Sequence, residues 1–185
     1  MAQDTLKSTS ITNLDASPVI QNTMGEGAAG YMQKVSDFAT TTSGVLLGST
    51  YRLCRFPSTA KIKSVKFTCA ALGGSTAFDI DIAHSDSTTD GTQPSLQGTI
   101  PQISSADNRL FGAAVSAATA LTFSDVTFSG TFTNVHRNTP IWNVLVLLGV
   151  TTFTADPGGS FDILLKSTAT NTSGGAVMID VDFME

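Results

Sequence analysis

The chain has 185 residues and a net charge of −5; Ser and Thr make up 47 of its residues, and charged residues only 14%. A negative chain argues against general nucleic-acid binding, which needs a basic surface, and the low charged fraction argues against long surface helices. Thirteen Asp against two Glu point the same way, because Asp favours turns where Glu favours helices. The composition predicts a β protein that is large enough to bury a sizeable core.

The predicted organisation is an extended N-terminal arm over residues 1–35 and one β-sandwich domain over residues 36–185. Residues 1–30 are polar without a stable hydrophobic period, which is typical of a segment that is disordered alone or orders against a partner. Residues 31–38 can form a first short strand. The N-terminus lacks the apolar core of a secretory signal, and the longest apolar run, residues 144–148, is too short to cross a membrane. We therefore expect a soluble protein that is made in a cytoplasm.

Residues 45–56 form the next predicted strand. Residues 61–85 then contain two strands around a Gly-rich turn, because apolar and polar side chains alternate on both sides of that turn. A hairpin with its turn at residues 74–75 would place Phe67 opposite Ile82. The same segment could instead cross between two packed sheets. Either route gives an antiparallel β domain.

The middle of the chain contains the one helical candidate, residues 105–120, where apolar residues fall at helical spacing after a capping Ser105. Gly112 weakens this helix, so we expect a turn or two at most. The preceding residues 85–97 are a loop by every turn signal. After the helical candidate, residues 122–135 alternate again. The side chains predicted to point inward there are Val126, Phe128 and Phe132.

Residues 138–140 interrupt the chain before a continuous apolar run at residues 141–149. This run fits a strand that is buried on both sides, or on one side with a subunit interface on the other. Two alternating strands follow, at residues 161–165 and 176–183. Six to nine strands with turns between them predict an all-β, antiparallel sandwich of the jelly-roll type, with at most one or two short helical turns.

The two cysteines, Cys54 and Cys69, could close a loop that contributes about 3 kcal/mol if they were oxidised. The strand pattern argues against this pairing. Cys69 shares the inward face of its strand, whereas Cys54 alternates with Tyr51 and Leu53, which look like the buried set. We expect two free, buried thiols, as a reducing compartment favours.

Catalysis needs a convergent set of titratable groups, and the sequence contains no catalytic motif. His84 ends an inward-facing row and is expected to be structural, and His136 lies in a polar connection. Two pairs of acids are spaced two residues apart: Asp79 with Asp81, and Asp180 with Asp182. Such pairs can hold a metal or serve a glycosidase, but a polar outer strand face explains both. We therefore expect no enzyme activity, no catalytic residue, no metal and no cofactor.

Several segments between residues 40 and 185 carry a resemblance to a known family. They are a strand leading to a Pro (LGSTYRLCRFPSTAKIKSVKF), a strand with alternating acids (AFDIDIAHSD), a short LFGAA segment, a Pro before an aromatic and apolar strand (PIWNVLVLLG) and a Gly-initiated last strand (GGAVMIDVDF). Their order resembles that of capsid decoration, or cement, proteins of tailed bacteriophages. The resemblance implies a jelly-roll or similar sandwich that sits on the major capsid protein lattice and stabilises the filled head.

We therefore predict a structural virion protein on the capsid surface, made in the bacterial host cytoplasm. Its partners would be the major capsid protein and copies of itself in a symmetric oligomer, with no nucleic acid and no membrane. The alternative is a head-fibre or tail-associated module that binds a receptor or carbohydrate. The candidate interface residues are a basic group, which could face an acidic capsid surface or be solvated strand positions, and the single Trp: Arg52, Arg55, Lys61, Lys63, Lys66 and Trp142.

Overall fold

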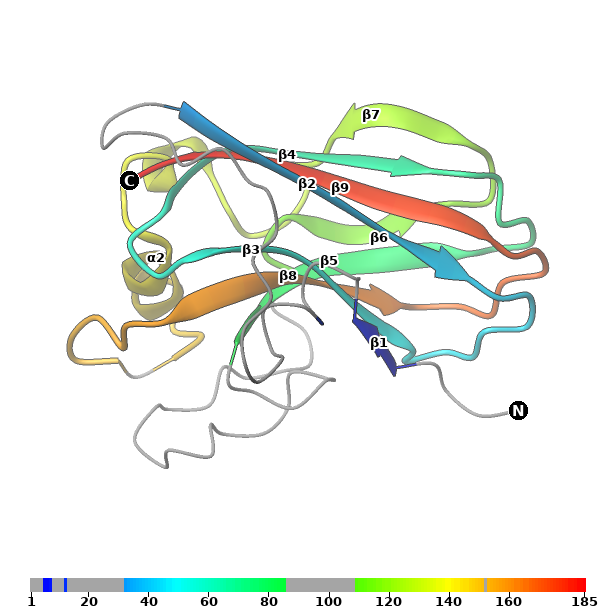
Figure 1. The fold of residues 1–185 in the computed structure, drawn as a ribbon, viewed down its shortest axis with the longest axis horizontal. Helices are drawn as coiled ribbons and strands as arrows, with labels where there is room; N and C mark the ends of the chain where they lie inside the picture. Colours follow the sequence, from blue (N-terminus) through cyan, green and yellow to red (C-terminus); the bar gives the residue numbers. More distant parts are fainter. Residues whose placement is uncertain (1–4, 8–11, 13–31, 86–108, 152) are drawn as a thin grey trace.

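The structure is a computed structural model that describes residues 5–7, 12, 32–85, 109–151 and 153–185. This part of the chain forms two packed β-sheets with short helices at one end (Figure 1). The five-stranded sheet contains, in spatial order, β1 (Thr5–Lys7), β3 (Thr50–Pro57), β8 (Ser160–Ser167), β5 (Ala77–His84) and β6 (Gly112–Ser116). The four-stranded sheet contains β2 (Met32–Thr41), β9 (Gly175–Met184), β4 (Lys61–Cys69) and β7 (Leu121–Asp125). The helices are the 3₁₀-helix η1 (Asn134–His136) and α2 (Ile141–Leu147).

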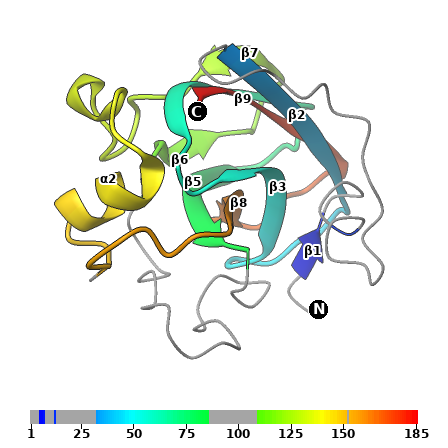
Figure 2. The ribbon, with the colours of Figure 1, turned by 60° about the vertical axis from the view of Figure 1, so that its left-hand side comes forward.

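The strand order is that of a jelly roll. From β2 to β5, each strand lies in the opposite sheet from the strand before it, and β7, β8 and β9 alternate in the same way. All strand pairs are antiparallel except β1 with β3. Figure 2 shows β2, β7 and β9 on one side of the core and β3, β5 and β8 on the other. The predicted all-β antiparallel sandwich is confirmed.

The core lies between the two sheets and is built from alternating apolar residues. On β9, the inward-facing side chains are Val177, Ile179, Val181 and Phe183, each no more than 2% exposed. Aromatic rings from the two sheets meet in this core. The ring centroids of Phe67 on β4 and Phe78 on β5 lie 6.0 Å apart, with the rings edge to face. Each such side chain contributes roughly 1.5–3 kcal/mol when buried, so the pattern of alternation holds the two sheets together.

The hairpin predicted for residues 61–85 is wrong, and the alternative crossing between sheets is right. β4 and β5 lie in different sheets, so Phe67 packs against Phe78 across the core instead of pairing with Ile82. The connection between them is anchored by Leu72, whose N–H donates to the carbonyl of Ala117 at 3.0 Å. The connection spans the two layers, because β4 and β5 belong to different sheets, and a two-residue turn cannot do this. Leu72, within the connection, is fully buried.

The strand predicted for residues 141–149 is also wrong, because Ile141–Leu147 forms helix α2. Three side chains of α2 are fully buried: Ile141, Val144 and Leu145. These positions recur at the three- and four-residue spacing of one helix face. The run contains enough apolar residues for either structure. The segment forms a helix because a helix closes the end of the sandwich, where Ile141 donates its backbone N–H to the carbonyl of Ala60 at 2.8 Å.

The helix predicted for residues 105–120 is wrong over the residues that the structure describes. Gly112–Ser116 forms strand β6, which pairs with β5 at the sheet edge. Residues 105–108, with the predicted capping Ser105, lie outside the described residues, as does most of the predicted loop at residues 85–97. Of the three side chains predicted to point inward after it, Val126 and Phe132 are buried, whereas Phe128 is 47% exposed.

The predicted N-terminal arm lies largely outside the described residues. Within them, β1 pairs in parallel with β3, and β2 starts at Met32 and pairs along its full length with β9. Strand β2 is therefore an edge strand of the four-stranded sheet. Among the described helices, none combines the length and the apolar character needed to cross a membrane.

Candidate protein interface

The structure separates the six residues predicted to form an interface. Arg52 and Arg55 lie on β3 in the five-stranded sheet, whereas Lys61, Lys63 and Lys66 lie on β4 in the four-stranded sheet. The five basic side chains therefore do not form one patch. The assumption that failed is that alternation along a strand implies an exposed outer face.

Arg52 is the clearest departure from the prediction, because its side chain is completely buried. Its guanidinium lies 2.7 Å from the carboxylate of Asp162 on β8 and donates to the carbonyl of His84 at 2.8 Å. Arg55 approaches the same carboxylate with two hydrogen bonds, at 2.7 and 2.9 Å. Both arginines thus stabilise the sheet, and Arg52 is not available to a partner. Sequence alternation on β8 could not reveal this role for Asp162.

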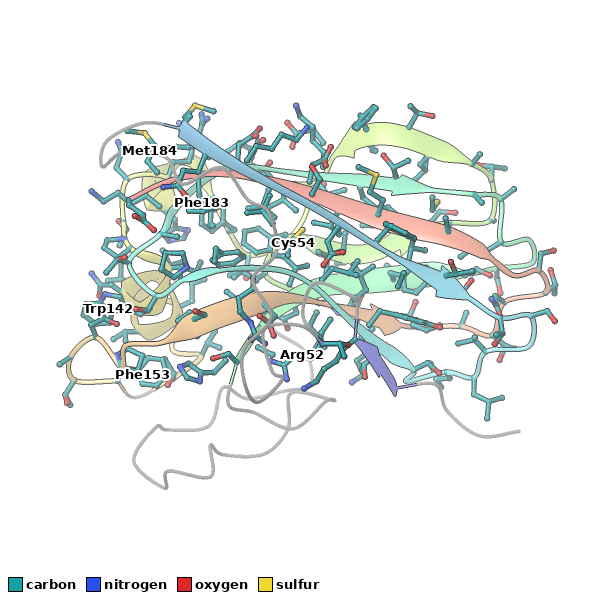
Figure 3. The ribbon with its side chains drawn as sticks, viewed as in Figure 1. Arg52, Cys54, Trp142, Phe153, Phe183 and Met184 are labelled. Carbon is teal, nitrogen blue, oxygen red and sulfur yellow. The ribbon has the colours of Figure 1, made fainter. Side chains whose placement is uncertain are left out.

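A β-bulge separates the two arginines. The register between β3 and β8 shifts between Leu53 and Arg55, and Cys54 has a φ of 49°. The bulge turns Cys54 inward although its neighbour Leu53 is inward too, so the alternation used to place Cys54 outside is wrong. Figure 3 shows Cys54 between the sheets and Arg52 on the other side of β3.

Both cysteines are free and buried, as predicted. Burial raises the pKa of the Cys54 thiol well above its usual range, and the nearby Asp37 and Asp180 carboxylates add to the effect. Its Sγ donates to the carbonyl of Ile179 at 3.2 Å. Burial also raises the pKa of Cys69. Neither thiol has the features of a reactive nucleophile.

Lys61 and Lys63 belong to a surface that we call the basic end: Lys61, Lys63, Phe128, Val135 and Arg137. The Nζ of Lys63 donates to the carbonyl of Arg137 at 2.8 Å and to Oδ1 of Asn138 at 2.7 Å. The Arg137 guanidinium lies 5.8 Å from the ring centroid of Phe128, and Val135 is 79% exposed. Partial burial and the charges of Arg137 and Lys61 lower the pKa of Lys63. The basic end therefore concentrates positive charge beside exposed apolar side chains.

Trp142 lies near this surface but is not an exposed aromatic platform. It belongs to α2, donates its backbone N–H to the carbonyl of Ser58 at 3.3 Å, and packs half-buried against the core. Figure 3 shows it at the end of the sandwich, together with Phe153. The exposed apolar residue of this helix is Leu147, at 64%.

Lys66 lies on a second surface, the outer face of the four-stranded sheet. The side chains of β2, β9, β4 and β7 on this side of the sheet include Met32, Lys34, Ser36, Phe38, Thr40, Ser64, Lys66, Thr68, Phe123, Asp125, Ala176, Met178, Asp180, Asp182 and Met184. Asp180 among them is only 2% exposed. Three of these are large apolar residues that are more than half exposed: Met32 at 63%, Phe38 at 63% and Phe123 at 53%. This surface was not predicted from the sequence. The sequence feature that could have revealed this surface is a pair of apolar residues, Phe38 and Met178, at outward positions of strands with alternating polarity.

Asp79 and His84 make contacts within the fold. Asp79 is buried, accepts the Ala114 N–H at 2.7 Å and pairs with Arg109 at 3.2 Å, so it is not on a solvated outer face. The ring of buried His84 lies 3.2 Å from the carbonyl of Gly158 and packs edge-on against Phe161. Within the described ranges, no group of three or more His, Cys, Asp or Glu side chains is arranged to hold a metal ion.

Comparisons with known proteins point to the fold. No family model matches the sequence, and no curated protein is significantly similar to it. Among solved structures, the chain is similar to one from the capsid of Ralstonia phage GP4, with a TM-score of 0.57 and 13% identity over 97% of each chain. A chain from the cyanophage Pam1 capsid asymmetric unit matches with a TM-score of 0.48 and 12% identity, over 92% of this chain and 96% of that one. At this identity the likeness to the GP4 capsid chain establishes a shared fold.

Proposed function

We propose that this chain is a structural protein of a tailed-phage virion, which binds the major capsid protein lattice and stabilises the filled head. The observation that supports this proposal is the jelly roll shared, over 97% of both chains, with a chain from the capsid of Ralstonia phage GP4. The match leaves little of either chain outside the common fold. The proposal includes assembly with copies of itself, location on the capsid surface and synthesis in the bacterial host.

The basic end is the surface that we propose for docking onto the capsid shell. It presents Lys61, Lys63 and Arg137 beside Phe128 and Val135, which are 47% and 79% exposed. The lowered pKa of Lys63 reflects partial burial and the neighbouring positive charges, which an acidic partner surface would offset. The exposed apolar side chains next to these charges supply apolar contact area, which charged side chains alone would not provide in an interface.

The alternative of a receptor- or carbohydrate-binding module has less support. Such modules stack sugar rings on exposed aromatic side chains, and the single Trp of this chain, Trp142, packs against the core. A glycan array that showed specific binding would favour the module over the capsid role.

The capsid role is tested with phage particles from which the protein has been removed. Particles that lack it should lose resistance to heat and osmotic shock, and adding the purified protein back should restore that resistance. A chain carrying Lys61→Glu and Lys63→Glu should bind the particles at least tenfold more weakly at low salt, because two attractive charges become repulsive. The matched control, Lys61→Arg with Lys63→Arg, keeps the charge and should bind normally. Unchanged particle stability would contradict the capsid role, and equal binding by both variants would contradict the docking surface.

A further inference from the structure

One arginine of the basic end, Arg137, differs from the other arginines of the chain. Arg52, Arg55 and Arg109 each lie within 3.2 Å of a carboxylate oxygen. In the part of the chain that the structure describes, the guanidinium of Arg137 has no hydrogen-bond acceptor and no ion pair, and its Nε is buried. A buried N–H without an acceptor costs free energy, so an acceptor supplied by a partner would be bound favourably here.

An aromatic stack holds this guanidinium in place. The central carbon of the Arg137 guanidinium lies 5.8 Å from the centroid of the Phe128 ring. Phe128 in turn stacks on Phe132, with ring centroids 6.1 Å apart and an angle of 14° between the ring planes. Because Phe132 is buried, the stack connects the guanidinium to the core. A cation that is already held loses less conformational freedom when it binds a partner.

The backbone around Arg137 brings a second cation to the same place. The N–H of Thr139 donates to the carbonyl of His136 at 2.9 Å, which fixes the turn that carries Arg137. The carbonyl of Arg137 then accepts a hydrogen bond from the Nζ of Lys63 on β4, at 2.8 Å. The fold therefore holds an ammonium group and a guanidinium group on one turn.

The positive charges of the basic end form no ion pair with a carboxylate of the described residues. Burial, and then the charges of Arg137 and Lys61, lower the pKa of Lys63, so these cations lie close enough to repel one another. Arg137 also contributes slightly to the lowered pKa of Asp125, but that carboxylate accepts its hydrogen bonds from Thr127. Repulsion that the fold does not offset is relieved when a partner supplies negative charge.

We propose that Arg137 binds an Asp or Glu side chain of the capsid protein and is the specific contact of the docking surface. Two parallel N–H groups of a guanidinium match the two oxygens of a carboxylate, which the point charge of a lysine does not. The exposed side chains of Val135 and Phe128 belong to the same surface and suit an apolar residue beside the acid. A nucleic-acid backbone is disfavoured by the net charge of −5. The inference deepens the proposed function and rests on it for the identity of the partner.

The first test uses the purified, unaltered chain without phage particles. The probe is sodium acetate, the comparison is sodium chloride at the same concentration, and nitrogen–proton NMR follows the Nε–H signals of the arginines. We expect acetate to shift the Nε–H signal of Arg137 further than chloride does. The Nε–H groups of Arg55 and Arg109 already donate to carboxylates, at 2.7 and 3.2 Å, so their signals are internal controls and should not move. Equal shifts of the Arg137 signal in the two salts would overturn the inference.

The second test measures how variants bind phage particles from which the protein has been removed. Arg137→Lys keeps the charge but loses the paired N–H groups and the planar stack, so it should bind roughly tenfold more weakly. Lys61→Arg with Lys63→Arg is the matched control and should bind normally, and circular dichroism verifies folding. Binding of Arg137→Lys as tight as that of the unaltered chain would overturn the inference. Lys61→Glu with Lys63→Glu tests the docking surface separately, so the two failures are distinguishable.

Discussion

The carboxylate of Asp162 lies 2.7 Å from the guanidinium of Arg52, and both side chains are completely buried. Arg55 shares that carboxylate through two further hydrogen bonds. The two cations come from either side of the β-bulge at Cys54, so one anion on β8 holds both sides of the irregular part of β3. Removing ions from water is costly, and this arrangement is stable only while every partner is present.

Replacing Asp162 with Asn should therefore destabilise the fold strongly. The change leaves Arg52 buried without its anionic partner, which typically costs about 3–5 kcal/mol. Denaturant unfolding followed by Trp142 fluorescence measures this loss. The exposed Asp156 offers a matched control, because Asp156→Asn removes the same charge outside the core and should cost less than about 1 kcal/mol. Equal effects of the two changes would show that the buried ion cluster is not important for stability.

Two leucines of α2 distinguish the helix from the strand that its composition suggested. Leu145 is fully buried and Leu147 is 64% exposed. Leu145→Ala should cost about 2–5 kcal/mol, whereas Leu147→Ala should cost less than about 0.5 kcal/mol. In a strand these residues would share one face and the two costs would be similar. Thermal or denaturant unfolding of both variants decides between the two structures.

The two thiols should differ in their reaction with a thiol reagent such as DTNB. Cys54 is 1% exposed with a pKa held high by burial, so it should react only as fast as the chain unfolds. Cys69, 5% exposed on β4, should react first but slowly. In denaturant, both should react at once. A Cys54→Ser chain, which should show only the faster phase in the native state, assigns the two rates.

The stability of the chain should fall in acid partly through Asp125. Hydrogen bonds from the hydroxyl and backbone N–H of Thr127 lower the pKa of Asp125 below its usual value. A carboxylate with a depressed folded pKa stabilises the fold above its unfolded pKa, and this contribution is lost as the pH falls from about 4 through the folded pKa. Asp125→Asn should therefore reduce the dependence of unfolding free energy on pH below about 4. If the unfolding free energy of the unaltered chain and of Asp125→Asn depended on pH in the same way below about 4, this assignment would be contradicted.

The sequence by itself determined the class of fold. Alternation on residues such as Phe78, Ile80 and Ile82 indicates a strand, because a strand places successive side chains on opposite sides. Turn residues between such segments then require an antiparallel sandwich. Free thiols were expected from the strand pattern and from a reducing compartment; both cysteines are free, although the position that the pattern gave Cys54 was wrong.

Tertiary structure alone decided which sheet each strand joins, where alternation breaks and which surfaces are exposed. A Gly-rich link permits both a hairpin and a crossing, and only packing of Phe67 against Phe78 selects the crossing. The bulge at Cys54 reverses the inward and outward positions, and nothing local in the sequence marks it. Arg52 is buried because Asp162, more than a hundred residues away, supplies its anion. Burial depends on neighbours brought together from distant parts of the chain, and a local pattern does not contain that information.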